Sequence, residues 1–437
     1  MKRENELTID LELTVKSPVH IGTGDTQVGN EYRIDGADAE AIDIPRYLDD
    51  NPGKAEDVIS VMKDEMSMAG LPDVEESYAR YPLRAWVDSE SIRGSPVQVA
   101  IKDGTNTPYI PGSSLKGWLR TALAYRVLDE KTKGSFLKKA IADVDEDEDI
   151  TALFRSESGD LKSDLLRCVT IRDAHPVSDP TLALCEIDTR RYKSAERDDE
   201  SQETGDPSWM GFSPTYAEFL LPTESLDTAT QATFTTEIQV DIGLLQRLLG
   251  SRAEPDVTVF GDELTKDRIQ ATIIDALQRF QQGVISEERS ILFGWPDSEN
   301  TVMDNFYEER LKRFISDPSE KDILFRVGAN TGQYSKTVME VLPARTKILT
   351  NVDDTLSHKN ETDCGGELSI EDDETDTLSC EECGEVVEPT FRQVDQFPKT
   401  RRGVQRLEAD PSEDTDDSTE WQYYPLGWIE ASLRGPL

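Results

Sequence analysis

The 437-residue sequence is poor in cysteine, histidine and basic side chains. Its five cysteines are too few and too unevenly spaced for the disulfide framework of a secreted domain. No stretch approaches the length of a membrane span, and the first residues, MKRENELTIDLEL, lack the apolar centre of a signal peptide. These absences predict a soluble, cytoplasmic chain with no membrane partner.

Basic charge is scarce, because 47 Lys and Arg residues face 88 Asp and Glu residues, for a net charge of −41. Such a balance ordinarily argues against a nucleic-acid partner. An acidic excess spread along the whole chain, with arginine commoner than lysine, is also typical of halophilic proteins adapted to molar intracellular salt. At about 1 M salt the Debye length is about 3 Å, so groups in direct contact decide binding. Local groups of residues must therefore identify the partner.

Period-two alternation predicts two strands with one buried face, at residues 7–15 and 234–242. Residues 216–221 (YAEFLL) could pair with the second strand across a loop, and residues 267–283 show the apolar spacing of a helix. Because strand and helix recur in both halves, we predict an α+β protein of two modules, residues 1–230 and 231–437. Acidic runs at 143–149, 371–376 and 408–420 are expected to be solvated loops or insertions.

Residues 110–125 (IPGSSLKGWLRTALAY) predict a helix that begins after a Pro-Gly break and is capped by Ser113 or Ser114. One apolar face is formed by Leu115, Trp118, Leu119, Ala122 and Leu123. Lys116 and Arg120 lie one turn apart on another face. Two interpretations follow: a capped helix with ordinary surface cations, or an anion site made of free helix-start amides and both cations. The absence of Asp and Glu from 111 to 128 favours the anion site.

Several motifs resemble a known family. YIPGSSLKGWLRTAL (109–123) resembles the hallmark helix of the RAMP proteins, the RNA-binding subunits of CRISPR effector complexes, and SPVHIGTGD (17–25) resembles their first strand and loop. Within that family, RVGANTGQYSKT (326–337), PKTRRG (398–403) and PLGWIE (425–430) are similar to the fifth subunit of the Csm series.

This resemblance implies a non-catalytic RNA-binding protein made of two ferredoxin-like (RRM-like) RAMP modules with long acidic insertions. It would belong to a type III-A CRISPR interference complex and cap the backbone filament at the crRNA 3′ end. There it would pack against the adjacent repeated backbone subunit and other Csm subunits. Host nucleases would trim the guide with its help, target RNA would be met only indirectly, and no cofactor would be required.

The resemblance also suggests RNA contacts. At the helix start, guide phosphates would be held by Gly112, Ser113, Ser114, Lys116 and Arg120. In the first loop, Gly22 and Gly24 would let the backbone approach RNA, and His20 would be either packed or in contact with RNA.

Two further segments are candidates for RNA contact. In RVGANTGQYSKT, Arg326 and Lys336 would bind phosphates and Tyr334 would stack on a base, with Gly328 and Gly332 flanking the loop; a simple glycine turn between strands is the alternative. The densest basic cluster, Lys399, Arg401 and Arg402, is the other candidate.

A cysteine-rich insertion near residues 355–390 carries a metal-ligand pattern. His358, Cys364, Cys380 and Cys383 give H-x5-C, a gap and C-x2-C, and a glycine follows both Cys364 and Cys383, as in a zinc knuckle. A regular ribbon would have cysteine at position 361, which is Glu361. A structural zinc site in a small zinc-ribbon-like insertion and a decayed ribbon without metal remain open at this point.

An enzyme would need an acid, a base or a nucleophile. With three histidines in the chain, a histidine-based ribonuclease would depend on His20 or His175. The alternative function is a metal-dependent endoribonuclease of the same superfamily that cuts target RNA through Asp25 or Asp35. The motifs favour the capping subunit, so we predict no enzymatic activity.

Overall fold

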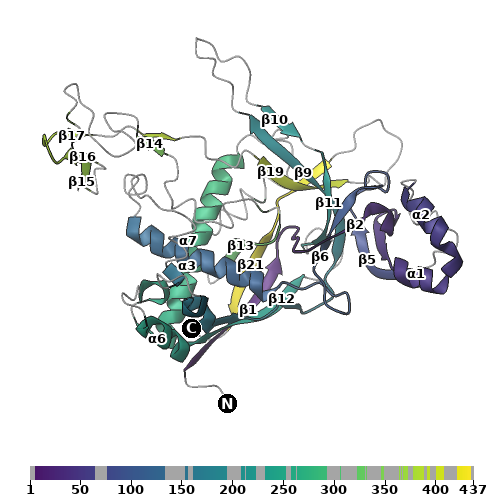
Figure 1. The fold of residues 1–437 in the computed structure, drawn as a ribbon, viewed down its shortest axis with the longest axis horizontal. Coiled ribbons are helices and arrows are strands. Elements are labelled where there is room, and N and C mark those ends of the chain that lie inside the picture. Colours follow the sequence, from purple (N-terminus) through teal and green to yellow (C-terminus); the bar gives the residue numbers. More distant parts are fainter. Residues whose placement is uncertain are drawn as a thin grey trace, which may run out of the picture.

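The computed structural model describes residues 5–63, 76–132, 153–155, 161–193, 208–211, 213–222, 232–251, 257–261, 263–292, 306, 322–329, 331, 346–348, 364, 366, 368–372, 377–387, 391–393, 400–407 and 421–434. These residues form a six-stranded sheet, a ten-stranded sheet, two small sheets and several helices (Figure 1). The predicted α+β class is confirmed. The acidic runs at 143–149 and 408–420 lie outside the described residues. Of the run at 371–376, only Glu371 and Asp372, at the end of a strand, are described.

The six-stranded sheet has the order β13-β21-β1-β12-β7, and β8 also pairs with β12. Its strands are β1 (Glu6–Val15), β7 (Val169–Ile171), β8 (His175–Pro176), β12 (Thr233–Asp241), β13 (Asp322–Arg326) and β21 (Trp428–Arg434). Every pairing is antiparallel. The sheet therefore combines strands from the beginning, middle and end of the chain.

The strand β1 pairs with strands from beyond the predicted division at residue 230. Its alternation is confirmed, since Leu7, Ile9, Leu11, Leu13 and Val15 are all buried. It pairs with β12 from Glu6 opposite Asp241 to Thr14 opposite Thr233, and with β21 on its other edge. A boundary at 230 would separate β1 from both partners, whose paired backbones and shared hydrophobic core hold the sheet together.

The ten-stranded sheet has the order β2-β6-β11-β9-β5-β4-β3, with β19 and β10 on β9 and β20 on β19. Its strands are β2 (Gly22–Val28), β3 (Tyr32–Asp35), β4 (Asp38–Ile42), β5 (Ala79–Ala85), β6 (Pro96–Ala100), β9 (Leu182–Lys193), β10 (Ser208–Gly211), β11 (Thr215–Leu220), β19 (Thr400–Leu407) and β20 (Trp421–Tyr424). The segment YAEFLL is a strand, β11, but it pairs with β9 and β6 rather than with β12. Its continuous burial, instead of alternation, fits a strand covered on both faces.

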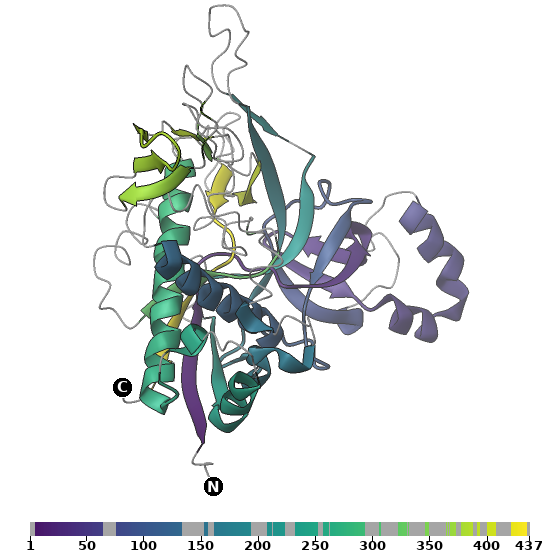
Figure 2. The same ribbon diagram turned by 60° about the vertical axis from the view of Figure 1, so that its left-hand side comes forward.

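Two helices pack on the six-stranded sheet. The helix α3 (Gly112–Thr132) buries the predicted apolar face, and its Trp118 ring stacks at 3.8 Å on Phe325 of β13. The helix α7 (Lys266–Leu292) buries Ile269, Ile273 and Leu277, as its spacing predicts. The two helices cross each other in Figure 2. The shorter α6 (Ile242–Gly250) directly follows β12, capped by the Asp241 carboxylate.

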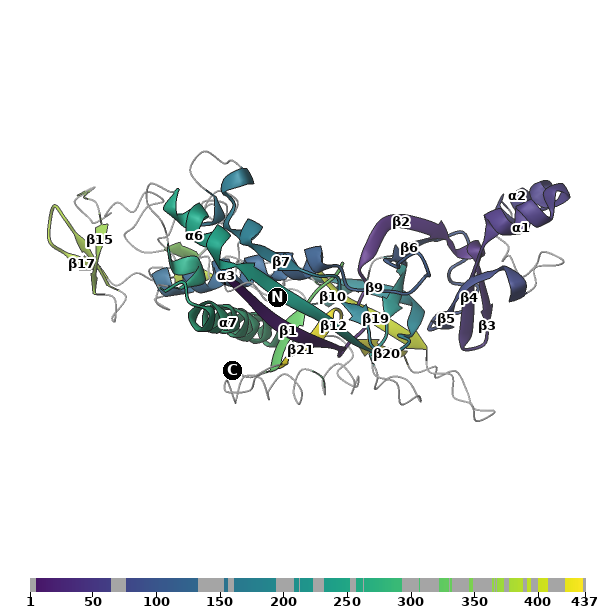
Figure 3. The ribbon, with the colours of Figure 1, turned by 90° about the horizontal axis from the view of Figure 1, so that it is seen from below.

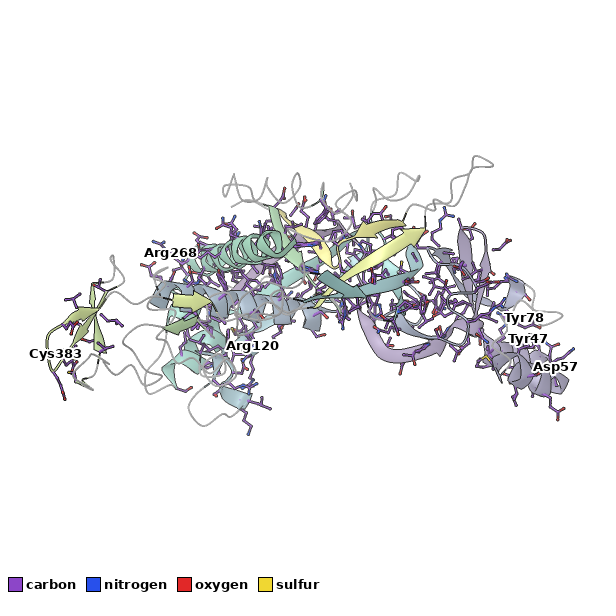
Figure 4. All side chains as sticks on the ribbon, turned by 90° about the horizontal axis from the view of Figure 1, so that it is seen from above. Tyr47, Asp57, Tyr78, Arg120, Arg268 and Cys383 are labelled. Atoms are coloured by element: carbon purple, nitrogen blue, oxygen red, sulfur yellow. The ribbon has the colours of Figure 1, made fainter. Side chains whose placement is uncertain are left out.

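A helical lobe inserted between β4 and β5 was not predicted from the sequence. It contains α1 (Ile44–Asp50) and α2 (Ala55–Lys63) and has its own hydrophobic cluster, in which the Tyr47 and Tyr78 rings meet edge to face at 5.1 Å. It projects at the opposite end of the molecule from the small sheet β15-β16-β17 (Figures 3 and 4). No helix among the described residues is long and apolar enough to cross a membrane.

Two further small sheets complete the fold. One pairs β14 (Thr346–Ile348) with β18 (Phe391–Gln393), and the other consists of β15 (Leu368–Asp372), β16 (Thr377–Cys380) and β17 (Val386–Val387).

A buried carboxylate links four strands of the ten-stranded sheet. Glu218 of β11 is fully buried and forms an ion pair with Lys102. It accepts hydrogen bonds from the Tyr32 hydroxyl at 2.9 Å, the Tyr81 hydroxyl at 2.7 Å and the Ala100 backbone N–H at 2.9 Å. Burial, and then the Glu218 charge, raise the pKa of both tyrosines, so their hydroxyls stay protonated as donors.

We expect Glu218→Gln to lower the free energy of unfolding by about 3–5 kcal/mol, because it leaves the Lys102 ammonium buried without its counter-charge. The matched control is Asp38→Asn, which removes the exposed ion pair between Arg84 and Asp38 and should cost less than about 1 kcal/mol. Urea denaturation of the purified chains measures both. Equal losses in the two variants would contradict a stabilising role for the buried carboxylate.

Candidate RNA interface

The start of α3 is already occupied by the protein's own acidic side chain. The Gly112 backbone N–H donates a hydrogen bond to the Asp173 carboxylate at 2.8 Å. Gly112 is buried so tightly that an added Cβ would lie 2.1 Å from the Ile171 carbonyl oxygen. A carboxylate therefore holds the position in which the sequence analysis expected a guide phosphate, while Ser113 is exposed and Ser114 half-buried.

The two cations of α3 also have partners within the chain. The Lys116 ammonium donates to the Val169 carbonyl at 2.7 Å, and burial lowers the pKa of Lys116. The Arg120 guanidinium, labelled in Figure 4, donates to the Asp164 carboxylate at 3.1 Å and lies 4.4 Å over the Phe154 ring. Lys116 thus links α3 to β7, and Arg120 links α3 to the segment before β7.

Asp164 shows why the favoured interpretation of this helix needs correction. Burial would raise the pKa of Asp164, but hydrogen bonds from Arg155, the Leu166 backbone N–H and Arg120 lower it below its usual value. The carboxylate is therefore ionised beside Arg120. The sequence has no acid between 111 and 128, but the fold brings Asp164 and Asp173 to this helix from more than 40 residues away. The site is neither free nor uniformly cationic.

Three residues beside the start of α3 were not predicted from the sequence to contact RNA: Tyr109, Arg172 and His175. Tyr109 stacks on His175 with ring centroids 5.9 Å apart and planes at 26°. The nearby Arg172 side chain is 65% exposed and pairs with Glu237 at 2.6 Å. His175 was considered only as a nuclease candidate; its exposure and its aromatic neighbour suit stacking with a base.

His20 is buried in the interior, as the packed alternative of the sequence analysis expects. Its side chain is 2% exposed, and its ring Nδ1–H donates to the Glu218 carbonyl at 2.7 Å. Burial lowers the pKa of His20 and favours the neutral ring. Gly22 is required next to it, because an added Cβ would lie 2.8 Å from the ring Nε2.

Three of the family motifs meet at one place, which we call the motif junction: residues 17–22, 326–331 and 425–428. The Ala329 N–H donates to the His20 carbonyl at 2.8 Å, the Gly427 N–H to the Pro18 carbonyl at 2.8 Å, and the Val327 N–H to the Gly427 carbonyl at 2.9 Å. Gly328, with φ +102°, passes so close that an added Cβ would lie 2.3 Å from the His20 carbonyl oxygen. This glycine serves protein packing.

Arg326, which the sequence analysis expected to bind a phosphate, also belongs to the motif junction and contacts protein groups there. It is 7% exposed, its Nε–H donates to the Leu426 carbonyl at 2.9 Å, and its guanidinium lies 5.3 Å from the centroid of the Trp428 ring. The other residues expected to bind RNA with it, Gly332, Tyr334 and Lys336, lie outside the described residues, as do Lys399 and the expected zinc ligand His358.

The strand β2 of the ten-stranded sheet has an exposed surface around Gly24. Gly24, with φ +91°, has nothing within 4 Å of an added Cβ, and β2 around it is exposed. The alternative nuclease residues Asp25 and Asp35 are exposed as well. Neither belongs to a cluster of three or more metal-binding side chains among the residues that the structure describes.

Strand pairing brings two basic segments together. Along β9 and β19, Arg401 lies opposite Arg190, Thr400 opposite Arg191, and Arg402 opposite Thr189. Two residues further along β9, Tyr192 lies opposite Trp209 of β10. The sequence analysis identified 399–402 but not its partner, although Arg190, Arg191 and Lys193 form an equally dense run. We call residues 189–193 and 400–402 the basic strand pair.

The three clustered cysteines come together in the small sheet β15-β16-β17. Their sulfur atoms all lie within 4.8 Å of one another, and those of Cys364 and Cys380 are 3.7 Å apart. The backbone N–H of Cys383 is the largest cause that lowers the pKa of Cys380, to about 6.

A model of the RAMP superfamily matches residues 12–332. The chain belongs to the RAMP superfamily. Among solved structures, a chain of a Csm–crRNA–target RNA ternary complex of a type III-A CRISPR-Cas system is similar at 18% identity and a TM-score of 0.52, covering 98% of this chain and 100% of that chain. The T. onnurineus Csm5 crystal structure is similar at 17% identity and a TM-score of 0.49, covering 76% and 92%. No curated protein matches the chain.

The motif junction can be tested with two glycines that both have positive φ. Gly24→Ala should cost about 1–2 kcal/mol of the free energy of unfolding, because only the backbone conformation is strained. Gly328→Ala should cost about 1–3 kcal/mol more, because its Cβ also collides with the His20 carbonyl. Urea denaturation measures the difference, and equal costs would show that the close approach does not constrain the fold.

Proposed function

We propose that the chain is a non-catalytic, cytoplasmic crRNA-binding subunit of a type III-A CRISPR interference complex, which caps the backbone filament at the crRNA 3′ end and assists crRNA maturation. Membership of the RAMP superfamily and the likeness in fold to a chain from a complex that contains crRNA support this proposal. Its partners would be crRNA, the adjacent repeated backbone subunit, other Csm subunits and the host nucleases that trim the guide.

The observation that carries the RNA-binding proposal is the basic strand pair. Like charges directly opposite each other on neighbouring strands destabilise a sheet, and Arg401 lies opposite Arg190. A bound polyanion offsets that repulsion. The neighbouring positions hold two aromatic residues, Tyr192 and Trp209. Proteins that bind single-stranded nucleic acid combine basic residues with aromatic residues on which bases stack. At molar salt, distant charges are screened, so basic side chains in direct contact with RNA bind it despite the net charge of −41.

The strand order supports a ferredoxin-like module in the six-stranded sheet. In chain order, β1, α3, β7, β12, α7 and β21 form a β-α-β-β-α-β series, and the sheet places these strands side by side as β21-β1-β12-β7. Such a module presents an RNA-binding sheet in RRM domains. The second predicted module would have to be built from the ten-stranded sheet rather than from residues 231–437.

We expect the double variant Arg190→Ala/Arg401→Ala to bind single-stranded RNA more weakly. A plot of the logarithm of the association constant against the logarithm of the salt concentration should become less steep by about 0.7 for each lost phosphate contact. Arg268→Ala is the matched control, because this arginine of α7 is 70% exposed and lies outside the basic strand pair (Figure 4). Fluorescence anisotropy with labelled RNA over a salt series measures both. An unchanged affinity of the double variant, or an equal loss in the control, would overturn the proposal that RNA binds at the basic strand pair.

Capping and the lack of nuclease activity are tested in the assembled complex. The double variant should yield copurified guides that lack nucleotides at the 3′ end, as RNA sequencing would show, because their 3′ portion is no longer protected. Regularly spaced cuts in complementary RNA should persist in Asp25→Ala and Asp35→Ala. Loss of these cuts in either variant would identify the chain as the metal-dependent endoribonuclease, and unchanged guide ends would contradict capping.

A further inference from the structure

The arrangement of the three cysteine sulfur atoms matches a zinc site. Thiolates bound at about 2.3 Å in a tetrahedron lie about 3.8 Å apart. The sulfur atoms of Cys364 and Cys380 are 3.7 Å apart, and all three pairs including Cys383 are within 4.8 Å. Among the described residues this is the one group of three or more His, Cys, Asp or Glu side chains placed to hold a metal ion.

The backbone around these sulfur atoms forms a tight turn. The Gly384 N–H donates to the Cys380 carbonyl at 2.9 Å, and the Cys380 N–H donates to the Glu385 carbonyl at 3.0 Å. Gly384 has φ +71°, a conformation that favours glycine.

The loop that carries Cys364 also approaches the Cys380 sulfur closely. An added Cβ at Gly366 would lie 2.5 Å from the Cys380 sulfur and 2.9 Å from the Glu382 Cβ. Gly366 is buried, two residues after Cys364. Both cysteine-bearing loops therefore converge on one point, which a glycine in each loop makes possible.

The small sheet needs such a link because its apolar core is slight. Its strands have 5, 4 and 2 residues. Leu368 and Leu378 are its buried aliphatic side chains among those described, and neither belongs to any of the three hydrophobic clusters of the chain. Sheets this small depend on a metal, a disulfide or other packing for stability.

We propose that Cys364, Cys380 and Cys383 bind one structural Zn²⁺ ion as thiolates, together with one further ligand, and that this ion holds the small sheet β15-β16-β17 together. Binding displaces the thiol protons and involves no change in oxidation state. The site lies at the end of the molecule opposite the α1–α2 lobe, where Figure 4 labels Cys383.

The metal content of the purified full-length chain tests this proposal. Wild type prepared without chelator should contain about one Zn²⁺ ion per chain by inductively coupled plasma mass spectrometry, and Cys380→Ser/Cys383→Ser should lose at least about nine-tenths of it. The control Cys185→Ala removes a cysteine outside the cluster and should keep the full content. Equal zinc in the double variant and the wild type would overturn the site.

A second measurement does not depend on folding of the variant. Wild type refilled with Co²⁺ should show the thiolate-to-cobalt charge-transfer absorption and the visible bands of tetrahedral cobalt. Absence of these bands would contradict the proposal. A disulfide between Cys364 and Cys380 would also contradict it. Such a disulfide would protect both cysteines from alkylation, and a reductant but not a chelator would remove that protection.

Discussion

The close approach of three backbone segments at the motif junction is the constraint on which the arrangement of both large sheets depends. Residues 16–21 carry the chain from β1 in the six-stranded sheet to β2 in the ten-stranded sheet, and residues 425–427 carry it back from β20 to β21. The two crossings are hydrogen-bonded to each other and to the segment after β13. Glycines 328 and 427 are needed there because both have positive φ and leave no room for a Cβ.

The motif junction is joined to the buried carboxylate by one side chain. His20 lies in the first crossing, and its ring donates to the backbone of Glu218, whose carboxylate binds Tyr32, Tyr81 and Lys102. The polar groups at the centre of the ten-stranded sheet are thus satisfied within the protein, as burial requires. The motifs around His20 and Gly328 therefore hold the two large sheets together through contacts within the chain.

Periodicity predicted the elements well and their partners poorly. The strands at 7–15 and 234–242 and the helices after 111 and near 267–283 correspond to β1, β12, α3 and α7, because their apolar spacing reflects one buried face each. The predicted pairing of β11 was wrong, and β1 pairs with strands beyond residue 230, because alternation does not show which strand lies alongside. The α1–α2 lobe was missed although Asp43 and Pro45 are a recognisable helix start.

The charged residues illustrate the same limit and bear on the proposed RNA contact. At α3, a phosphate would have to displace the Asp173 carboxylate from the Gly112 amide and the Asp164 carboxylate from Arg120, and would be repelled by both. These acids are distant in sequence, so no local pattern reveals them. At the basic strand pair, the fold instead sets arginines from two segments about 210 residues apart opposite each other. The charges around α3 therefore oppose a bound polyanion, whereas the register of β9 and β19 supports the proposed RNA contact at the basic strand pair.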